Sequence, residues 1–232
     1  ICSRGHCIHI GARGKIKKVG NVRRYLIITA DDYGLTAGVS RGIRAAIHKG
    51  SVTSVSALVT PGTTGHACVA AQEISIGLHF NLTRGKPLTQ SSRIPTLVAE
   101  DGHFFHVNTE MFRHYAPHDV ATELEAQLLR FRRLFKRTPA YIDSHHHIHQ
   151  YAPLYAVIAR YAAQLGIPVR RRYWSRRTFL ERRTLTTDHV AARFDPAQHW
   201  TERSLCAAIT RLRPGITELI VHPGYCDQSL RK

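Results

Sequence analysis

Short apolar runs rich in β-branched residues alternate with segments of helical periodicity along most of this 232-residue chain. Runs of this kind are typical of buried strands. The predicted strands span residues 26–30, 52–59, 75–78, 141–142, 167–169 and 219–221. Strands that alternate with helices imply a parallel sheet. The sequence therefore predicts an α/β fold in one domain, with a sheet that is either wound open or closed as a barrel.

Helical patterns fill the connections between these strands. The longest predicted helix begins with Asp119 as its N-cap and carries apolar residues at three- and four-residue steps up to Phe135. Gly50 and Gly166 follow two further helical patterns and are expected to end those helices. Shorter helices are expected at residues 67–71 and 205–212.

Acidic and histidine side chains gather where the predicted strands end. In chain order they are Asp31 and Asp32, His79, Asp143 and His145, and His222. The carboxyl ends of parallel strands open onto one face of a sheet or barrel, and active sites of α/β folds are built there. We therefore expect these side chains to form an active site.

The segment 143–149 packs four histidines and an aspartate directly after a predicted strand. Imidazole nitrogens are good ligands for divalent transition metals, and a neighbouring carboxylate adds a ligand or orients a histidine. The cluster is internal and interrupted by Ile148, so it differs from a purification tag. The histidines could instead satisfy a polar turn, but matching groups at other strand ends favour a metal site.

Adjacent carboxylates at Asp31 and Asp32 place two charges at a sheet end, where unpaired charge is costly. Neighbours in an extended segment point to opposite sides, so one could bind a metal while the other faces substrate. Asp32 could also cap the following helix, and His79 could be a hydrogen-bonded core residue. The shared position of Asp32, His79 and His145 favours metal ligation.

Five short motifs occur in a fixed order between about residue 25 and the C-terminus. They are Thr-Ala-Asp-Asp-Tyr-Gly-Leu at 29–35, Val-Thr-Ser-Val-Ser at 52–56, Gly-Leu-His-Phe-Asn-Leu-Thr at 77–83 with Gly-Lys-Pro-Leu at 85–88, Asp-Ser-His-His-His-Ile-His at 143–149, and His-Pro-Gly-Tyr at 222–225. In these motifs the chain resembles the YdjC-like carbohydrate deacetylase family.

The resemblance implies a distorted (β/α) TIM-like barrel that hydrolyses the N-acetyl group of N-acetylglucosamine-containing oligosaccharides. It implies one divalent metal ion, magnesium or zinc, with manganese or cobalt as alternatives. The family's metal ligands fall on Asp32, His79 and His145. Asp31 matches the catalytic base, and His222 matches a second catalytic histidine that could donate a proton to the leaving amine.

Further residues are expected to support the ligands or to contact the acetylated amino-sugar substrate. They are Asp143, which would orient a histidine, and His147, His149, Asn81 and Arg170. Metal, carboxylate and histidine also serve phosphoesterases and other amidohydrolases on α/β barrels. The residues alone leave those reactions open.

The formal net charge of +17 raises the alternative of a nucleic-acid-binding module. Arginines crowd residues 170–183, with Tyr173 and Trp174 among them, and such a mixture could contact a phosphate backbone and stack on bases. The sequence carries no zinc-finger, helix-turn-helix or RNA-recognition signature. We therefore expect a solvated basic loop near a substrate cleft, without a nucleic-acid partner.

Cysteine usage and hydropathy bear on the compartment. The cysteines are Cys2, Cys7, Cys68, Cys206 and Cys226. Their odd number and scattered positions argue against a disulfide framework and suit a reducing cytoplasm. Two of them lie near His6 and His9, but in a spacing that matches no standard zinc finger. No apolar run reaches the length of a membrane span, so we expect a cytoplasmic protein without a membrane partner.

Both ends of the chain depart from the family. Residues 1–24 read as an unrelated basic extension, for which disorder is one option, before a barrel domain at 25–232. Relatives continue through another helix and strand after the last motif, so the barrel is expected to be incomplete at its C-terminus. Residues 219–221 or 26–28 would then have an uncovered edge, through which a homodimer could form.

Overall fold

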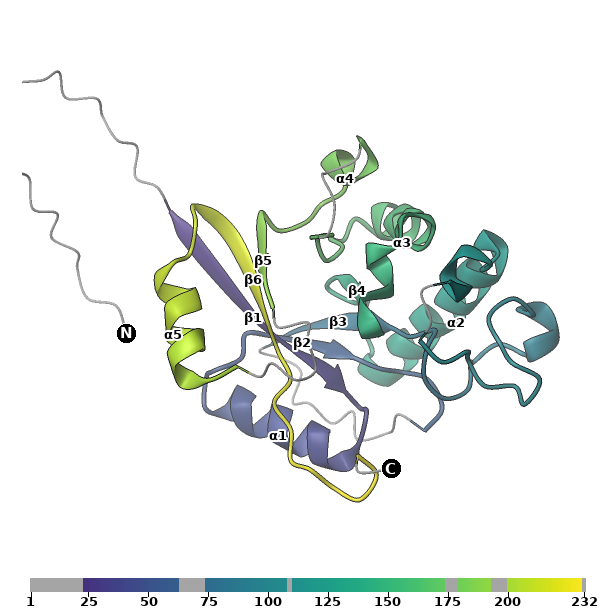
Figure 1. Cartoon of the computed structure of the whole chain (residues 1–232), viewed down its shortest axis with the longest axis horizontal. Helices are drawn as coiled ribbons and strands as arrows, with labels where there is room; N and C mark the ends of the chain where they lie inside the picture. The colour runs from purple at the N-terminus through teal and green to yellow at the C-terminus, as the bar shows by residue number, and fades with distance from the viewer. Residues whose placement is uncertain (1–22, 63–73, 108–109, 174–178, 193–199, 231–232) are drawn as a thin grey trace, which may run out of the picture.

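A six-stranded parallel sheet forms the centre of the computed structural model, which describes residues 23–62, 74–107, 110–173, 179–192 and 200–230 (Figure 1). The strands are β1 (Arg24–Tyr33), β2 (Ser54–Ala57), β3 (Ser75–Phe80), β4 (Ile142–Ser144), β5 (His189–Ala191) and β6 (Gly215–Val221). Their spatial order is β4-β3-β2-β1-β6-β5, and all neighbouring strands run parallel. The predicted α/β class is confirmed.

The sheet curls into half of a barrel, and the chain beyond β4 continues the curl. An isolated parallel bridge joins Ile142 to Val169. The Val169 N–H in turn donates a hydrogen bond to the carbonyl of Leu185, on the segment that leads to β5. The strand predicted at 167–169 is therefore present only as a single bridge.

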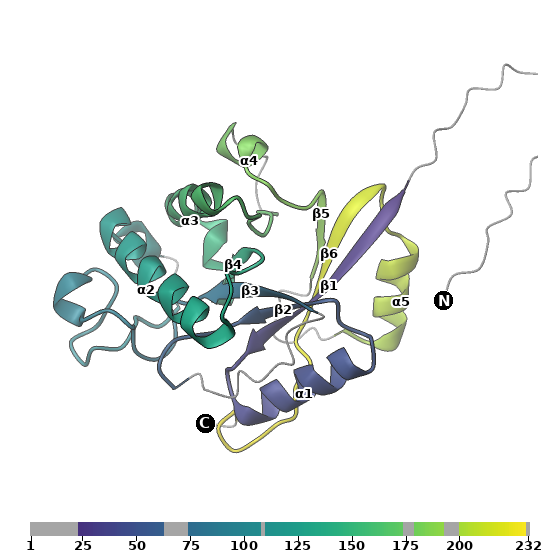
Figure 2. The ribbon, with the colours of Figure 1, turned by 180° about the vertical axis from the view of Figure 1, so that it is seen from behind.

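Helices connect the strands along the outside of the sheet (Figures 1 and 2). They are α1 (Ala37–His48), α2 (Pro117–Phe135), α3 (Ala152–Leu165), α4 (Phe179–Arg183) and α5 (Glu202–Thr210), with 3-10 helices η1 (Ser91–Arg93), η2 (Met111–Arg113) and η3 (His145–Gln150). α2 and α3 pack against each other, and their side chains Leu124, Phe131 and Ile158 are fully buried in the core. Within the described ranges, no helix has both the length and the apolar character needed to cross a membrane.

The start of α2 differs from the prediction. The N-cap is Ala116 and Pro117 occupies the first turn, where a missing N–H is tolerated, so the prediction that Asp119 caps this helix is wrong. The Oδ2 atom of Asp119 instead accepts hydrogen bonds from the N–H and the hydroxyl of Thr96, at 3.0 and 2.7 Å. This carboxylate ties a preceding loop to the helix. The helix predicted at 67–71 lies outside the described residues.

Neither β1 nor β6 has an uncovered edge, so that expectation for residues 26–28 or 219–221 is wrong. β1 pairs with β2 on one side and with β6 on the other, from Arg24–Gly215 to Ala30–Val221. β6 also pairs with β5. β5 has only three residues, His-Val-Ala, all partly exposed. Such a short segment carries no clear strand pattern, which is why the sequence gave no sign of the neighbour that covers β6.

A tyrosine ring inside the curl requires a glycine on the adjacent strand. The hydroxyl of Tyr141 accepts a hydrogen bond from Ser54 Oγ at 2.9 Å. A Cβ atom on Gly77 would lie 2.3 Å from Cε2 and 2.6 Å from Cδ2 of this ring. These separations are well inside van der Waals contact, so any side chain at position 77 would displace the ring.

We expect Gly77→Ala to lower the free energy of unfolding by about 1–3 kcal/mol, the usual cost of overpacking. Alanine normally suits a strand interior better than glycine, so the loss would come from the ring contact. Urea denaturation measures it, and the double variant Gly77→Ala/Tyr141→Leu should recover part of the loss. An unchanged denaturation midpoint in the single variant would contradict this packing.

Candidate metal centre

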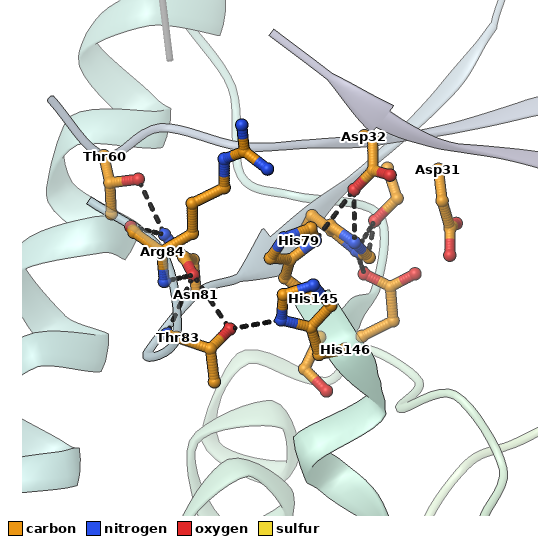
Figure 3. A network of polar contacts seen from close by, with 12 residues as sticks. Asp31, Asp32, Thr60, His79, Asn81, Thr83, Arg84, His145 and His146 are labelled. Carbon is orange, nitrogen blue, oxygen red and sulfur yellow. Dashed lines mark hydrogen bonds and ion pairs between the residues drawn. The ribbon is translucent and has the colours of Figure 1, made fainter. Parts of the chain in front are cut away.

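Asp32, His79 and His145 point toward one another at the carboxyl end of the sheet (Figure 3). One potential ligand atom from each lies within 4.8 Å of the others. His79 Nε2 lies 3.2 Å from Asp32 Oδ1, and His145 Nδ1 lies 2.8 Å from the same oxygen. All three side chains are largely buried, with at most 15% of their surface exposed. The structure thus brings together the three side chains predicted to bind a metal.

The backbone at Asp32 turns its side chain toward the two histidines. Its φ angle is 69°, and the register of β1 against β2 shifts between Ala30 and Tyr33. A bulge of this kind re-aims side chains, and a left-handed conformation is uncommon for a residue other than glycine. Simple strand alternation, on which the prediction relied, is therefore not what separates Asp32 from Asp31.

Two buried atoms of this cluster have no hydrogen-bond partner within the described residues, namely Asp32 Oδ1 and His145 Nε2. Imidazole nitrogens approach Asp32 Oδ1, but not in the geometry of a hydrogen bond. Buried polar atoms are normally paired, because desolvation without a partner is costly. One carboxylate oxygen and two imidazole nitrogens are a ligand set for zinc and related divalent ions. The residues present fit the implied metal ion.

The electrostatics of the cluster favour positive charge. Burial acts to raise the pKa of Asp32, but the nearby His145 and His79 outweigh it and hold that pKa well below its usual value. Burial acts to lower the pKa of His79, but the carboxylates of Asp143 and Asp31 outweigh it and raise the pKa to about 10. A proton on His79 therefore occupies a place where a cation is strongly stabilised.

Arg170 lies fully buried among three carboxylates beside this cluster. Its Nη1 and Nη2 atoms donate to the two oxygens of Asp31 at 2.7 and 2.8 Å, and its Nε donates to Glu218 Oε1 at 3.0 Å. Nη2 also lies 2.6 Å from Asp143 Oδ2. The other oxygen of Asp143 lies 2.8 Å from His79 Nδ1, which directs His79 Nε2 toward the cluster. The expectation that the basic segment is solvated is therefore wrong for Arg170.

Asp31, the predicted base, is fully buried in this network. Burial alone would raise its pKa, but Arg170, His79 and, more weakly, His222 lower that pKa to about 2. Asp31 is therefore ionised at neutral pH, and each oxygen keeps a lone pair beyond its bond to Arg170. His222 follows β6 directly and is exposed, at the same end of the sheet.

His147 and His149 lie behind the cluster. His149 is fully buried, and its Nδ1 lies 2.6 Å from Ser144 Oγ while its Nε2 lies 2.7 Å from Gln150 Nε2. His147 packs against the rings of His149 and Tyr173, with centroid separations of 5.9 Å in both cases. Because both nitrogens of His149 contact protein atoms, this residue shapes the turn that carries the histidine cluster.

Asn81 organises a turn next to the cluster (Figure 3). Its Oδ1 accepts hydrogen bonds from the N–H groups of Thr83 and Arg84 at 3.0 and 3.1 Å. The Thr83 hydroxyl lies 2.9 Å from Nδ1 of His146, whose ring stacks on His145 with a centroid separation of 3.9 Å. His146 is exposed and borders the metal cluster, although the sequence analysis gave it no role.

Two other participants were missed. Ser56 donates a hydrogen bond to Asp143, and Glu218 pairs with Arg170. A glutamate directly before the apolar run 219–221 could have indicated an ion pair inside the sheet, because a charge in a buried strand needs a partner. Ser56 carried no signal, since serine is common near strand ends.

Comparisons with known proteins agree on one family. The family model described as YdjC-like protein matches residues 25–232. Two relatives named chitooligosaccharide deacetylase, from Salmonella schwarzengrund (strain CVM19633) and Salmonella paratyphi C (strain RKS4594), are each 34% identical over 223 residues, which is 91% of this chain and 86% of the relative. A crystal structure from Enterococcus faecalis V583, of a protein named provisionally for cellobiose-phosphate cleavage, aligns with a TM-score of 0.79 and 30% identity over 90% of this chain and 84% of that one.

We expect His145→Ala to weaken zinc binding by more than the roughly 10- to 100-fold typical of a lost outer partner, because the variant lacks a direct ligand. Isothermal titration of the chelator-treated protein with zinc measures the affinity. His103→Ala is the matched control, because His103 is exposed and pairs only with Asp101 among the described residues. Equal zinc affinity in the two variants would contradict the site.

Proposed function

The chain belongs to the YdjC-like family, and we propose that it is a metal-dependent hydrolase that removes the N-acetyl group from N-acetylglucosamine-containing oligosaccharides. The observation that carries the proposal is the convergence of Asp32, His79 and His145 beside the Asp31–Arg170 pair. The curled sheet belongs, in this proposal, to a distorted TIM-like barrel, whose active site lies at the carboxyl ends of the strands.

Asp32, His79 and His145 would hold one divalent metal ion. When bound, such an ion supplies Lewis acidity and makes water more acidic. Two imidazoles and one carboxylate suit zinc, and magnesium, manganese and cobalt are the alternatives. Asp143 holds His79 in the orientation that ligation needs, since its Oδ1 lies 2.8 Å from Nδ1 and leaves Nε2 directed at Asp32.

Asp31 is the proposed general base. Arg170 keeps it ionised and fixes the orientation of its carboxylate. The carboxylate can therefore take a proton from a water molecule as that water attacks the acetyl carbonyl carbon. The C–N bond then breaks to give acetate and the free amino sugar. His222, exposed near Asp31, would donate the proton that the leaving amine requires.

We expect the two neighbouring aspartates to respond differently to replacement by asparagine. Asp31→Asn should keep metal and lower turnover by about 10²–10⁴-fold, the range for a lost general base. Asp32→Asn should weaken metal binding, because a neutral amide oxygen is a poorer ligand. Acetate release from N-acetylated chitooligosaccharides, with parallel metal analysis, measures both effects.

The control for this experiment is Asp101→Asn, which removes an exposed carboxylate away from the cluster. Equal loss of metal in Asp31→Asn and Asp32→Asn would contradict the division of roles. Chelator should abolish acetate release by the wild-type protein, and added metal should restore it. Release of phosphate from phosphorylated sugars, without acetate release, would assign the site to a phosphoesterase instead.

A further inference from the structure

Residues 222–230, here the post-β6 segment, run back along the start of α1 (Figures 1 and 2). The N–H of Tyr225 donates to the carbonyl of Gly38 at 3.1 Å, although these residues are far apart in the sequence. Gly224 lies directly against Gly42. Because the segment begins with His222, its contact with α1 fixes the path of the chain that carries this histidine.

Asp227 fastens the post-β6 segment to the helix N-terminus. Its Oδ2 atom accepts a hydrogen bond from the Gly38 N–H at 2.6 Å, and its Oδ1 accepts one from the Leu230 N–H at 3.0 Å. The first turn of α1 contains no acidic residue of its own. A carboxylate is stabilised at a helix N-terminus by the free N–H groups and the helix dipole, so Asp227 supplies the charge that this turn lacks.

Two glycines, four residues apart on one face of α1, permit the close approach. A Cβ atom on Gly38 would lie 2.2 Å from the Tyr225 carbonyl oxygen, and one on Gly42 would lie 2.5 Å from the Gly224 Cα. Glycine inside a helix costs about 1 kcal/mol relative to alanine. The close backbone contact gives these two positions a reason for glycine that helix stability does not.

The same end of α1 also holds the loop after Asp32. The Leu35 N–H donates to the Asp32 carbonyl at 3.0 Å. The Gly34 N–H donates to Oγ of Ser40, a buried residue of α1, at 3.1 Å. The first turns of α1 therefore anchor two segments at once, one that carries Asp31 and Asp32 and one that carries His222.

We propose that Gly38, Gly42 and Asp227 are positioning residues that hold His222 opposite Asp31. This inference rests on the proposed function, in which Asp31 removes a proton from water and His222 donates one to the leaving amine. Both segments are fixed to one rigid helix, so the proton acceptor and the proton donor keep a constant separation. Placement errors of about 1 Å can lower turnover 10²-fold, so such an anchor has a direct effect on rate.

The test compares Gly42→Ala and Asp227→Asn with the control Ser229→Ala, which alters an exposed residue of the same segment. We expect both test variants to lower kcat for an N-acetylated chitooligosaccharide by about 10- to 100-fold, with KM and metal content close to wild type. Amide hydrogen exchange at Tyr225 should become faster. Gly42→Ala should keep or raise the melting temperature, since alanine favours the helix.

Two further measurements separate positioning from general damage. In a His222→Ala background, Gly42→Ala should cause no additional loss of kcat, because its effect acts through His222. With 4-nitrophenyl acetate, whose leaving group needs no proton, the loss should be much smaller than with the N-acetyl sugar. An additional loss in the His222→Ala background, or unchanged exchange and kcat in both variants, would overturn the proposal.

Failure of the proposed function has a different signature. If the wild-type protein with metal releases no acetate from any acetylated sugar, the assignment of the reaction is wrong. The exchange rate at Tyr225 in Gly42→Ala and Asp227→Asn then decides alone whether the post-β6 segment is anchored to α1.

Discussion

The buried guanidinium of Arg170 is the interaction on which the site depends. It pairs with Asp31, Asp143 and Glu218, which reach it from three different strands of the sheet. Removing one partner of such a network leaves buried charge uncompensated, at a cost of about 3–5 kcal/mol. Asp143 transmits the order to His79, and these carboxylates together exceed the charge of one guanidinium. A divalent cation at the neighbouring cluster offsets the excess.

The sequence located the carboxyl ends of the strands, and with them the residues of the metal cluster. It did so because acidic and histidine side chains followed apolar strands in a repeated pattern. Arg170 was grouped with solvated arginines because it is followed by Arg171 and Arg172. One position decides between solvent and core in that run, and only the pairing with Asp31 and Glu218 shows which arginine turns inward.

Fold class followed from the alternation of strands and helices, whereas several details did not. β5 is too short and too exposed to give a strand pattern, and the expectation of an uncovered β6 failed for that reason. Asp119 matched an N-cap by residue type, but its carboxylate bonds to Thr96, a contact between segments that no local pattern reports. The bulge at Asp32 likewise depends on register between strands.

X-ray diffraction at the zinc absorption edge, from crystals grown with zinc, tests the central claim most directly. The account predicts an anomalous peak about 2.0–2.2 Å from one oxygen of Asp32 and one nitrogen each of His79 and His145. Arg170 should remain paired with Asp31 in the same crystal. A peak bound only at other histidines or cysteines, or no peak between these three side chains, would contradict the account.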